Sequence, residues 1–337
     1  MRGLDPLHPR DSIRGYSWSR VRSPPVRPLA GKVASYDAPS TEEIARRTGL
    51  APAQIIRFDG NTSPEPLPST RAEALAEELA RIHTYPHGGY PRLLAAIAQY
   101  AGVSAENIVL GAGADDLVML LTRSFAGPGD CVAIANDPTY ALFDIAVRVA
   151  GAEVGDDDPV VTICCRPNNP TGELGPIPAA RPLVVDEAYF EYARDSAVDL
   201  IEDGVVVIRT FSKAFGLAGA RVGYALAGRD VAADLNERQH PAPISTLSAA
   251  LALAGLASPP DITPILEERE RFAERLRGVG LDPLQSEGNF LYVPVDNPQT
   301  LADGLLAQGL AVRPVRGGIR ITVRNEPDDE RLLAALQ

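Results

Sequence analysis

Three apolar runs constrain the fold of this chain more than any other feature of its sequence. They cover residues 160–164, 183–185 and 205–208, and they show almost no alternation of polar and apolar positions. A strand with one wet face alternates, whereas a strand that is buried on both faces does not. Earlier in the chain, strand patterns at 107–110 and 131–135 alternate with helical patterns at about 117–125 and at 140–149. We therefore expect an α/β fold with a mainly parallel sheet covered by helices on both faces.

A second, smaller unit follows the sheet. Helical patterns at 246–256 and 263–277 precede strand patterns at 289–293, 311–313 and 319–323, which predicts an α+β arrangement. We expect residues 60–235 to form a large domain, and residues 36–59 with 236–337 to form a small one. Residues 1–35 contain seven Lys and Arg against two Asp, together with many prolines, which is typical of a mobile arm.

Composition excludes several classes of function. The net charge of −12 argues against nucleic acid or an anionic membrane as a partner. No stretch approaches the roughly 20 apolar residues of a membrane span. The N-terminus has no apolar signal core. The three Cys and four His residues show no metal-ligand spacing, so no metal is expected. Unpaired thiols in apolar runs favour a reducing, cytoplasmic location.

Lysine is almost absent from the chain. Only Lys32 and Lys213 occur among 32 Lys and Arg residues. Arginine can replace lysine in most ion pairs, but it cannot lose a proton and attack a carbonyl group. Lys32 lies in the N-terminal arm, where a solvated charge is expected. Lys213 follows an apolar strand and precedes a strand at 221–226, and at that position it could form a Schiff base with an aldehyde cofactor.

The neighbours of Lys213 point to a phosphate. Thr210, Ser212 and Arg221 place two hydroxyl groups and a guanidinium around one loop. An aldehyde cofactor that carries a phosphate is pyridoxal phosphate (PLP). The stretch from Arg209 to Tyr224, RTFSKAFGLAGARVGY, resembles the cofactor-lysine segment of PLP-dependent aminotransferases of fold type I. Among them it is most similar to the histidinol-phosphate aminotransferase family, and the resemblance extends from about residue 36 to residue 320.

PLP chemistry makes further demands on the chain. The Gly-rich turn after the strand at 107–110 suits a dianion at a helix N-terminus, and the resemblance places Gly113, Ala114 and Asp115 at the cofactor phosphate. Asp186 ends a buried strand and is expected to keep the pyridine nitrogen protonated. The resemblance further assigns hydrogen bonds to the ring oxygen and stacking on the ring to three side chains: Asn169, Tyr189 and Tyr140.

The substrate side rests on the resemblance. Arg320 matches a carboxylate-binding arginine, and Arg313 is expected to be a second anion ligand. Tyr36 and Asn61 match positions of the substrate pocket. Tyr85 matches a tyrosine that reaches across a homodimer interface to the cofactor phosphate of the partner subunit. Thr62 stands where the family usually has Glu.

The expected activity moves an amino group from a small donor to a keto acceptor, in a homodimer with shared sites. Histidinol phosphate and 2-oxoglutarate, giving imidazole-acetol phosphate and glutamate, are the expected pair. The alternatives are an aromatic amino acid aminotransferase, a threonine-phosphate decarboxylase and a non-catalytic protein with a PLP fold. Retention of Lys213, Asp186, Tyr189, Asn169 and Arg221 together argues against the last.

Overall fold

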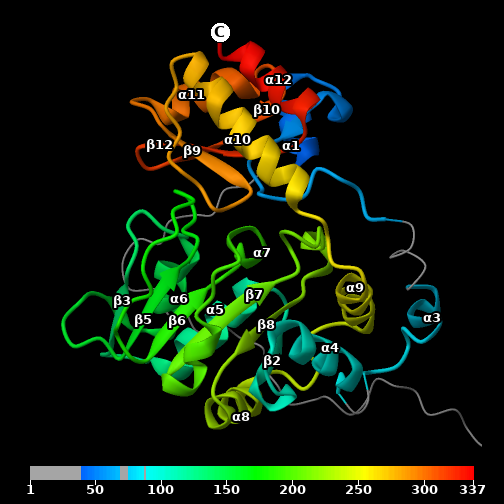
Figure 1. The fold of residues 1–337 in the computed structure, drawn as a ribbon, viewed down its shortest axis with the longest axis vertical. Helices are drawn as coiled ribbons and strands as arrows, with labels where there is room; N and C mark the ends of the chain where they lie inside the picture. Colours follow the sequence, from blue (N-terminus) through cyan, green and yellow to red (C-terminus); the bar gives the residue numbers. More distant parts are fainter. Residues whose placement is uncertain (1–38, 69–74, 87–88) are drawn as a thin grey trace, which may run out of the picture.

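The computed structural model describes residues 39–68, 75–86 and 89–337, and it shows a large and a small lobe (Figure 1). A seven-stranded sheet forms the centre of the large lobe, with the strand order β2-β8-β7-β6-β5-β3-β4. Strand β8 alone runs opposite to the other six strands, so the predicted mainly parallel sheet is confirmed. The strands are β2 Ile108–Gly111, β3 Cys131–Ile134, β4 Glu153–Val154, β5 Val161–Cys165, β6 Leu183–Asp186, β7 Val205–Thr210 and β8 Gly223–Leu226.

Helices cover both faces of this sheet, which explains the uninterrupted apolar runs. Val184 and Val206 belong to the core formed with α5 (Ala114–Phe125), α6 (Leu142–Ala150) and α8 (Arg229–Arg238). Their neighbours Val185 and Val207 belong to the opposite core, with α4 (Pro91–Ala101) and α9 (Thr246–Ala257). Successive side chains of a strand point to opposite faces, so every position must be apolar when both faces are covered.

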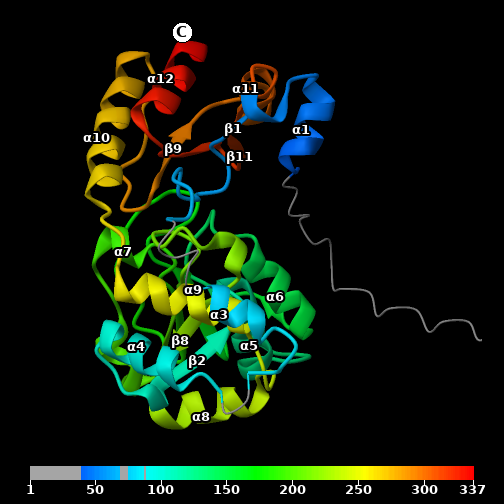
Figure 2. The ribbon, with the colours of Figure 1, turned by 90° about the vertical axis from the view of Figure 1, so that its right-hand side faces the viewer.

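The small lobe contains two further sheets. Strands β9 (Phe290–Pro294), β12 (Gly318–Thr322) and β11 (Arg313–Val315) form an antiparallel sheet, and β1 (Ile56–Arg57) pairs with β10 (Leu310–Ala311) in parallel. Figure 2 shows α10 (Thr263–Gly278) and α12 (Glu326–Ala335) on one side of these strands, with α1 (Thr41–Thr48) and α11 (Pro298–Leu306) on the other. The predicted strand at 311–313 is divided, because the chain changes sheets at Val312.

The position of α9 matters for the boundary between the lobes. It contacts α4 and α3 (Leu75–Ala80), and Ala252 packs in the core of the large lobe. Both views show α3 beside α9 at the edge of that lobe (Figures 1 and 2). The chain enters the small lobe at the short link between α9 and α10. Within the described residues, no helix has the length and apolar character needed to cross a membrane.

Candidate active site

Lys213 lies in the loop between β7 and β8, where the sheet meets the small lobe. Its Nζ donates to the Gly60 carbonyl oxygen at 3.2 Å and lies 5.7 Å from the centroid of the Tyr189 ring. Burial, together with the nearby Arg320 guanidinium, lowers the pKa of Lys213 to about 8. A lysine with this pKa has a neutral, nucleophilic fraction near neutral pH, as covalent and general-base chemistry requires.

Asp186 is brought to the same edge of the sheet, because β6 and β7 are parallel neighbours with Asp186 opposite Ile208. Its side chain is buried, and Oδ1 accepts a hydrogen bond from the Ala188 amide at 3.0 Å. Burial raises the pKa of this carboxyl to about 7. A cation at Asp186 would stabilise its charged form, and a protonated pyridine nitrogen is such a cation. This carboxyl therefore fits the ring of PLP.

The turn between β2 and α5 forms an anion cradle with the end of β7. Helix α5 begins at Ala114, and its N-cap Gly113 has φ 88° and provides no side-chain cap. The first amide groups of a helix have no partner within the helix and attract anions. Arg221 reaches this turn, with Nη2 3.2 Å from Asp115 Oδ2. A Cβ atom added to Gly113 would lie 2.8 Å from Arg221 Nη2, so the guanidinium packs directly on the glycine.

Two hydroxyl groups lie at the end of β7 beside this turn. Thr210 Oγ1 donates to Ser212 Oγ at 2.9 Å, and both side chains are buried. Gly223, opposite Thr210 in β8, packs against the backbone of Gly113. The two hydroxyls, the α5 terminus and Arg221 make a donor set that suits a phosphate dianion.

Tyr140 belongs to the same cradle. Its hydroxyl donates to Asp115 Oδ1 at 3.0 Å, and its ring packs edge-on against Phe143. The loop that carries Tyr140 follows β3, whose carboxyl end lies at the same edge of the sheet as those of β5 and β6. The structure thus brings Tyr140 next to the anion-binding turn, as a side chain stacked on the cofactor ring would need.

Asn169 is oriented by Arg320. Arg320 Nη1 donates to Asn169 Oδ1 at 2.6 Å, which leaves the Asn169 amide nitrogen as the group that can donate to a cofactor oxygen. Arg320 is buried, and its Nη2 also donates to the Asp59 carbonyl oxygen. A single guanidinium therefore fixes the amide on which a ring oxygen would depend.

Asn61 is held by a buried network that the sequence did not reveal. Its side-chain Nδ2 donates to the Tyr189 hydroxyl at 3.0 Å, and its backbone N–H donates to Thr322 Oγ1 at 2.9 Å. Asn289 Nδ2 donates to the Asn61 carbonyl oxygen at 3.2 Å. These contacts support the left-handed conformation of Asn61, which has φ 50°. Burial raises the pKa of Tyr189, so its hydroxyl stays protonated.

Arg313 and Arg320 are direct partners across the β11–β12 pair. Side chains of directly paired residues project from the same face of a sheet, and like charges placed opposite one another repel. Two guanidinium groups on one face of a sheet can hold an anion between them through paired hydrogen bonds. The pair is therefore a candidate anion site beside Lys213, whose pKa the Arg320 charge lowers.

Tyr85 is not gathered into this cluster within the single chain. It is 77 % exposed, on the segment that follows α3. The predicted pocket residue Tyr36 lies outside the described residues. Among the residues that are described, no group of three or more His, Cys, Asp or Glu could hold a metal ion.

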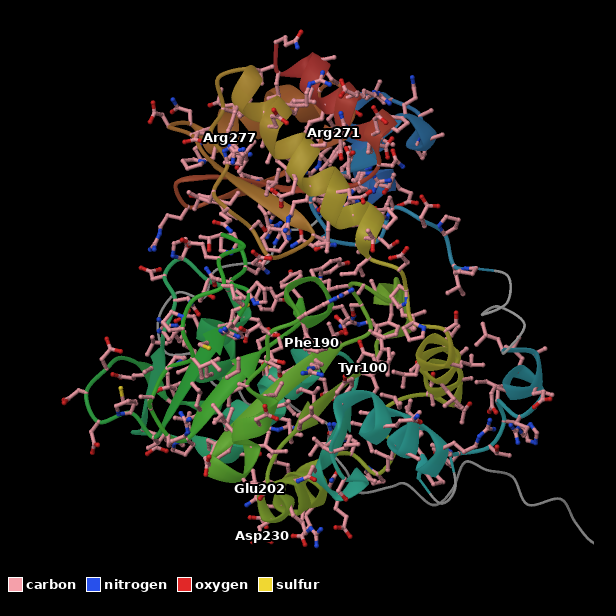
Figure 3. The ribbon with its side chains drawn as sticks, in the orientation of Figure 1. Tyr100, Phe190, Glu202, Asp230, Arg271 and Arg277 are labelled. Carbon is pink, nitrogen blue, oxygen red and sulfur yellow. The ribbon has the colours of Figure 1, made fainter. Side chains whose placement is uncertain are left out.

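A buried ion pair connects the two strands that carry the cluster. Arg209 Nε lies 3.1 Å from Glu187 Oε2, and Arg209 Nη2 donates to Ser196 Oγ at 2.7 Å. The guanidinium carbon lies 3.5 Å from the centroid of the Phe190 ring, which is labelled in Figure 3 together with nearby Tyr100. Glu187 directly follows Asp186 at the end of β6, and Arg209 directly precedes Thr210 at the end of β7. The ion pair therefore fixes the strand end that carries Asp186 relative to the strand end that leads to Lys213.

Together the parallel sheet, the lysine loop, the buried carboxyl and the anion cradle define a PLP-dependent enzyme of fold type I. The chain belongs to the aminotransferase class I and II family, whose family model matches residues 54–156 and 155–336. This match confirms the expected enzyme class, a PLP-dependent aminotransferase.

Individual relatives span nearly the whole chain. Histidinol-phosphate aminotransferase 1 of Dechloromonas aromatica is 32 % identical, over 88 % of this chain and 92 % of its own length. The aromatic amino acid aminotransferase of Rhodococcus opacus is also 32 % identical, over 84 % of this chain and 89 % of its own. The structure of histidinol-phosphate aminotransferase from Sinorhizobium meliloti in complex with PLP has a TM-score of 0.80 and 26 % identity, and covers 90 % of this chain and 94 % of that one.

Proposed function

We propose that this enzyme transfers the amino group of histidinol phosphate to 2-oxoglutarate, giving imidazole-acetol phosphate and glutamate. The observation that carries this proposal is the pairing of Arg313 and Arg320 on one face of the small-lobe sheet. Glutamate brings two carboxylates, and histidinol phosphate brings a phosphate. Guanidinium groups bind either anion through paired hydrogen bonds, so one pair can serve both substrates in turn. The curated histidinol-phosphate aminotransferase relatives support the same substrate.

Most of the predicted site residues have a role in this proposal. When bound, PLP supplies an electron sink for the pair of electrons left at the substrate Cα. Lys213 Nζ would hold the cofactor, take the proton from the substrate Cα and deliver it to the cofactor carbon, first as a general base and then as a general acid. Asp186 holds a proton on the pyridine nitrogen. Arg320 binds a carboxylate of 2-oxoglutarate or glutamate, and through Asn169 Oδ1 it also orients the amide that donates to the ring oxygen.

The phosphate is held by the cradle of α5, Thr210, Ser212 and Arg221. Gly113 and Ala114 contribute backbone amides at the helix start. Asp115 accepts from the Tyr140 hydroxyl and thereby sets the position of the Tyr140 ring.

We also propose a cytoplasmic homodimer in which Tyr85 contacts the partner's cofactor phosphate. Large apolar side chains gather near Tyr85: Leu79 and Ile82 are each 55 % exposed. Helix α9, which lies beside this segment, has apolar or small side chains on all its faces. Exposed apolar surface of this kind is typical of an interface. The two domains would be the two lobes, and the packing of α9 favours a boundary near residue 258 instead of residue 236.

An aromatic amino acid aminotransferase is the second candidate. Thr62 favours it, because a neutral side chain replaces the Glu expected for recognition of an imidazole ring. The Rhodococcus opacus relative carries that name at the same identity.

Single-turnover absorbance distinguishes these candidates. The PLP form is mixed with histidinol phosphate, phenylalanine or threonine phosphate, and conversion of the cofactor to its amine form is followed. We expect histidinol phosphate to react with the highest kcat/KM. Faster conversion by phenylalanine would favour the aromatic enzyme, and carbon dioxide released from threonine phosphate would identify a decarboxylase.

The role of Lys213 has a separate test. Borohydride treatment of the PLP-loaded protein, followed by peptide mapping, should place the cofactor on Lys213. Lys213→Arg should retain noncovalent cofactor binding and lose turnover. A label on Lys32, the other lysine of the chain, would contradict the assignment.

A further inference from the structure

A cavity of about 560 Å³ lies between the lobes, beside the residues that follow Lys213. We call it the hinge pocket, because it is bounded by the link from α9 to α10. Its remaining walls come from the Ser63–Pro68 segment, from the start of α12 and from the residues that directly follow Lys213. Lys213, Asp186 and Arg320 do not line it, so it is a separate cavity from the candidate active site. Its volume suits a small organic molecule.

The floor of the hinge pocket contains an unpaired acceptor. Asn289 lines the pocket and is only 2 % exposed. Its Nδ2 is committed to the Asn61 carbonyl oxygen, which fixes the orientation of the amide. Its Oδ1 has no hydrogen-bond partner within the described residues. Buried acceptors are nearly always satisfied in folded proteins, so this oxygen fits a ligand that brings an N–H or O–H donor.

The charge of the lining selects the sign of the ligand. Four carboxylates line the pocket, those of Glu65, Asp261, Glu268 and Glu326. Arg271 lies 2.6 Å from Glu268 and 3.9 Å from Glu326, so Glu65 and Asp261 supply most of the negative charge that faces the cavity. Arg324 is the one guanidinium among the described lining residues, and its Nε donates to Asp328 Oδ2 at 2.7 Å. An excess of carboxylates around a cavity with low-dielectric walls attracts a cation and repels an anion.

The walls select the body of the ligand. Most are apolar and stiff: the side chains of Tyr192, Phe215 and Ile265, and six prolines at positions 64, 66, 68, 259, 260 and 264. Proline has a fixed φ, so these walls are preorganised, and a flat ring loses little entropy between them.

We propose that the hinge pocket is a second binding site, for a small organic cation that carries an N–H donor on a flat apolar body, such as an amidinium or an imidazolium. The N–H group binds Asn289 Oδ1, and the carboxylates of the rim neutralise the charge. Asn289 donates to Asn61, and Asn61 donates to Tyr189. A ligand at this site is therefore connected to Tyr189 in the active site through three successive hydrogen bonds. This inference goes beyond the proposed reaction and does not depend on its substrate.

Three isosteric probes test the proposal by titration calorimetry of the PLP-loaded enzyme. Benzamidine is a cation with N–H donors, benzamide is neutral and benzoate is an anion, and all three have the same ring. We expect benzamidine to bind at least tenfold more tightly than benzamide, and its affinity to fall with added salt. Equal affinities for benzamidine and benzamide would overturn the proposal.

Matched variants locate the site. Glu65→Gln removes one negative charge from the rim and should weaken benzamidine binding several-fold. Asp282→Asn removes one negative charge from a side chain that is 92 % exposed and does not line the pocket, so it should leave the affinity unchanged. Asn289→Ala removes the acceptor and should weaken binding further. If Asn289→Ala does not fold, the first two variants decide, and equal effects of both would refute the site.

Discussion

Replacing Arg209 by methionine tests how much the buried ion pair contributes to the structure. Arg209 and Glu187 are 2 % and 0 % exposed, so the variant leaves a carboxylate that water cannot reach. It also removes the hydrogen bond to Ser196 and the contact with the Phe190 ring. Methionine fills a similar volume, so most of the expected effect comes from charge and not from a cavity.

The expected loss follows from these contacts. Removing one partner of a buried ion pair typically costs about 3–5 kcal/mol, because the remaining charge is uncompensated. Glu187 keeps two donors, the Ala197 amide at 2.6 Å and the Ser196 hydroxyl at 2.8 Å. These offset part of the loss, so we expect the free energy of unfolding to fall by about 3 kcal/mol. The double variant Arg209→Met/Glu187→Leu removes both charges and should recover at least about 1 kcal/mol.

The pH dependence of the free energy of unfolding distinguishes a charge effect from a packing effect. Burial raises the pKa of Glu187 even beside the Arg209 guanidinium, which opposes the shift. Without that guanidinium the pKa rises further. A carboxyl whose folded-state pKa exceeds its unfolded value stabilises the fold below the unfolded pKa and loses this contribution as the pH rises through the folded pKa. The loss in free energy of unfolding caused by Arg209→Met should therefore shrink as the pH is lowered from 8 toward 5.

Urea unfolding followed by circular dichroism, at one fixed protein concentration, measures these differences. The matched control is Arg229→Met, because Arg229 pairs with Glu106 at 2.8 Å while both side chains are more than 60 % exposed. Exposed pairs contribute about 0–1 kcal/mol, so this control should change little. If Arg209→Met loses no more than the control, or if the double variant is no more stable than the single one, the electrostatic argument is wrong.

Further substitutions probe the site itself. Gly223→Ala should weaken PLP binding measured by fluorescence titration, since the added Cβ would lie 2.8 Å from a backbone oxygen of β7, whereas Gly219→Ala, with no atom within 4 Å of its Cβ, should not. The rate of PLP attachment to Lys213 should rise with pH to a plateau, with its midpoint near pH 8, because only the neutral amine reacts, and a midpoint near 10.5 would contradict the lowered pKa. Arg320→Lys should reduce kcat/KM about a hundredfold in steady-state assays, since one ammonium nitrogen lacks the planar fork with which a guanidinium pairs with a carboxylate while its two nitrogens reach Asn169 and Asp59, and a loss below fivefold would remove it from the carboxylate site. Mixing Lys213→Ala chains with Tyr85→Ala chains should restore activity in the heterodimer, and no recovery in verified heterodimers would mean that each site is built within one chain.

The local sequence was sufficient to predict the mainly parallel sheet and the cofactor. Runs such as 205–208 are apolar at each position because the sheet is covered on both faces, and that cause leaves a direct record in the sequence. Lys213, Thr210, Ser212 and Arg221 lie within twelve residues of one another, so a single loop brings them together. Their chemistry could be predicted because few other tasks require a lysine in a chain that otherwise uses arginine.

Contacts between distant segments could not be predicted in this way. Thr322 and Asn61 are separated by 261 positions, and neither belongs to a pattern that identifies the other. The same holds for Asn289, which supports Asn61 and forms the floor of the hinge pocket. Asparagine and threonine are ordinary turn and strand residues, so their composition carries no signal until the lobes meet.

The sequence by itself therefore determined the fold class and the cofactor, because secondary-structure periodicity and the chemistry of one loop are local properties. Only the tertiary structure decided which side chains hold that loop in place. The buried Arg209–Glu187 pair, the Asn61 network and the hinge pocket all depend on the packing of segments that are far apart in the chain. The free energy of such contacts depends on burial and geometry, which arise only when the whole chain has folded.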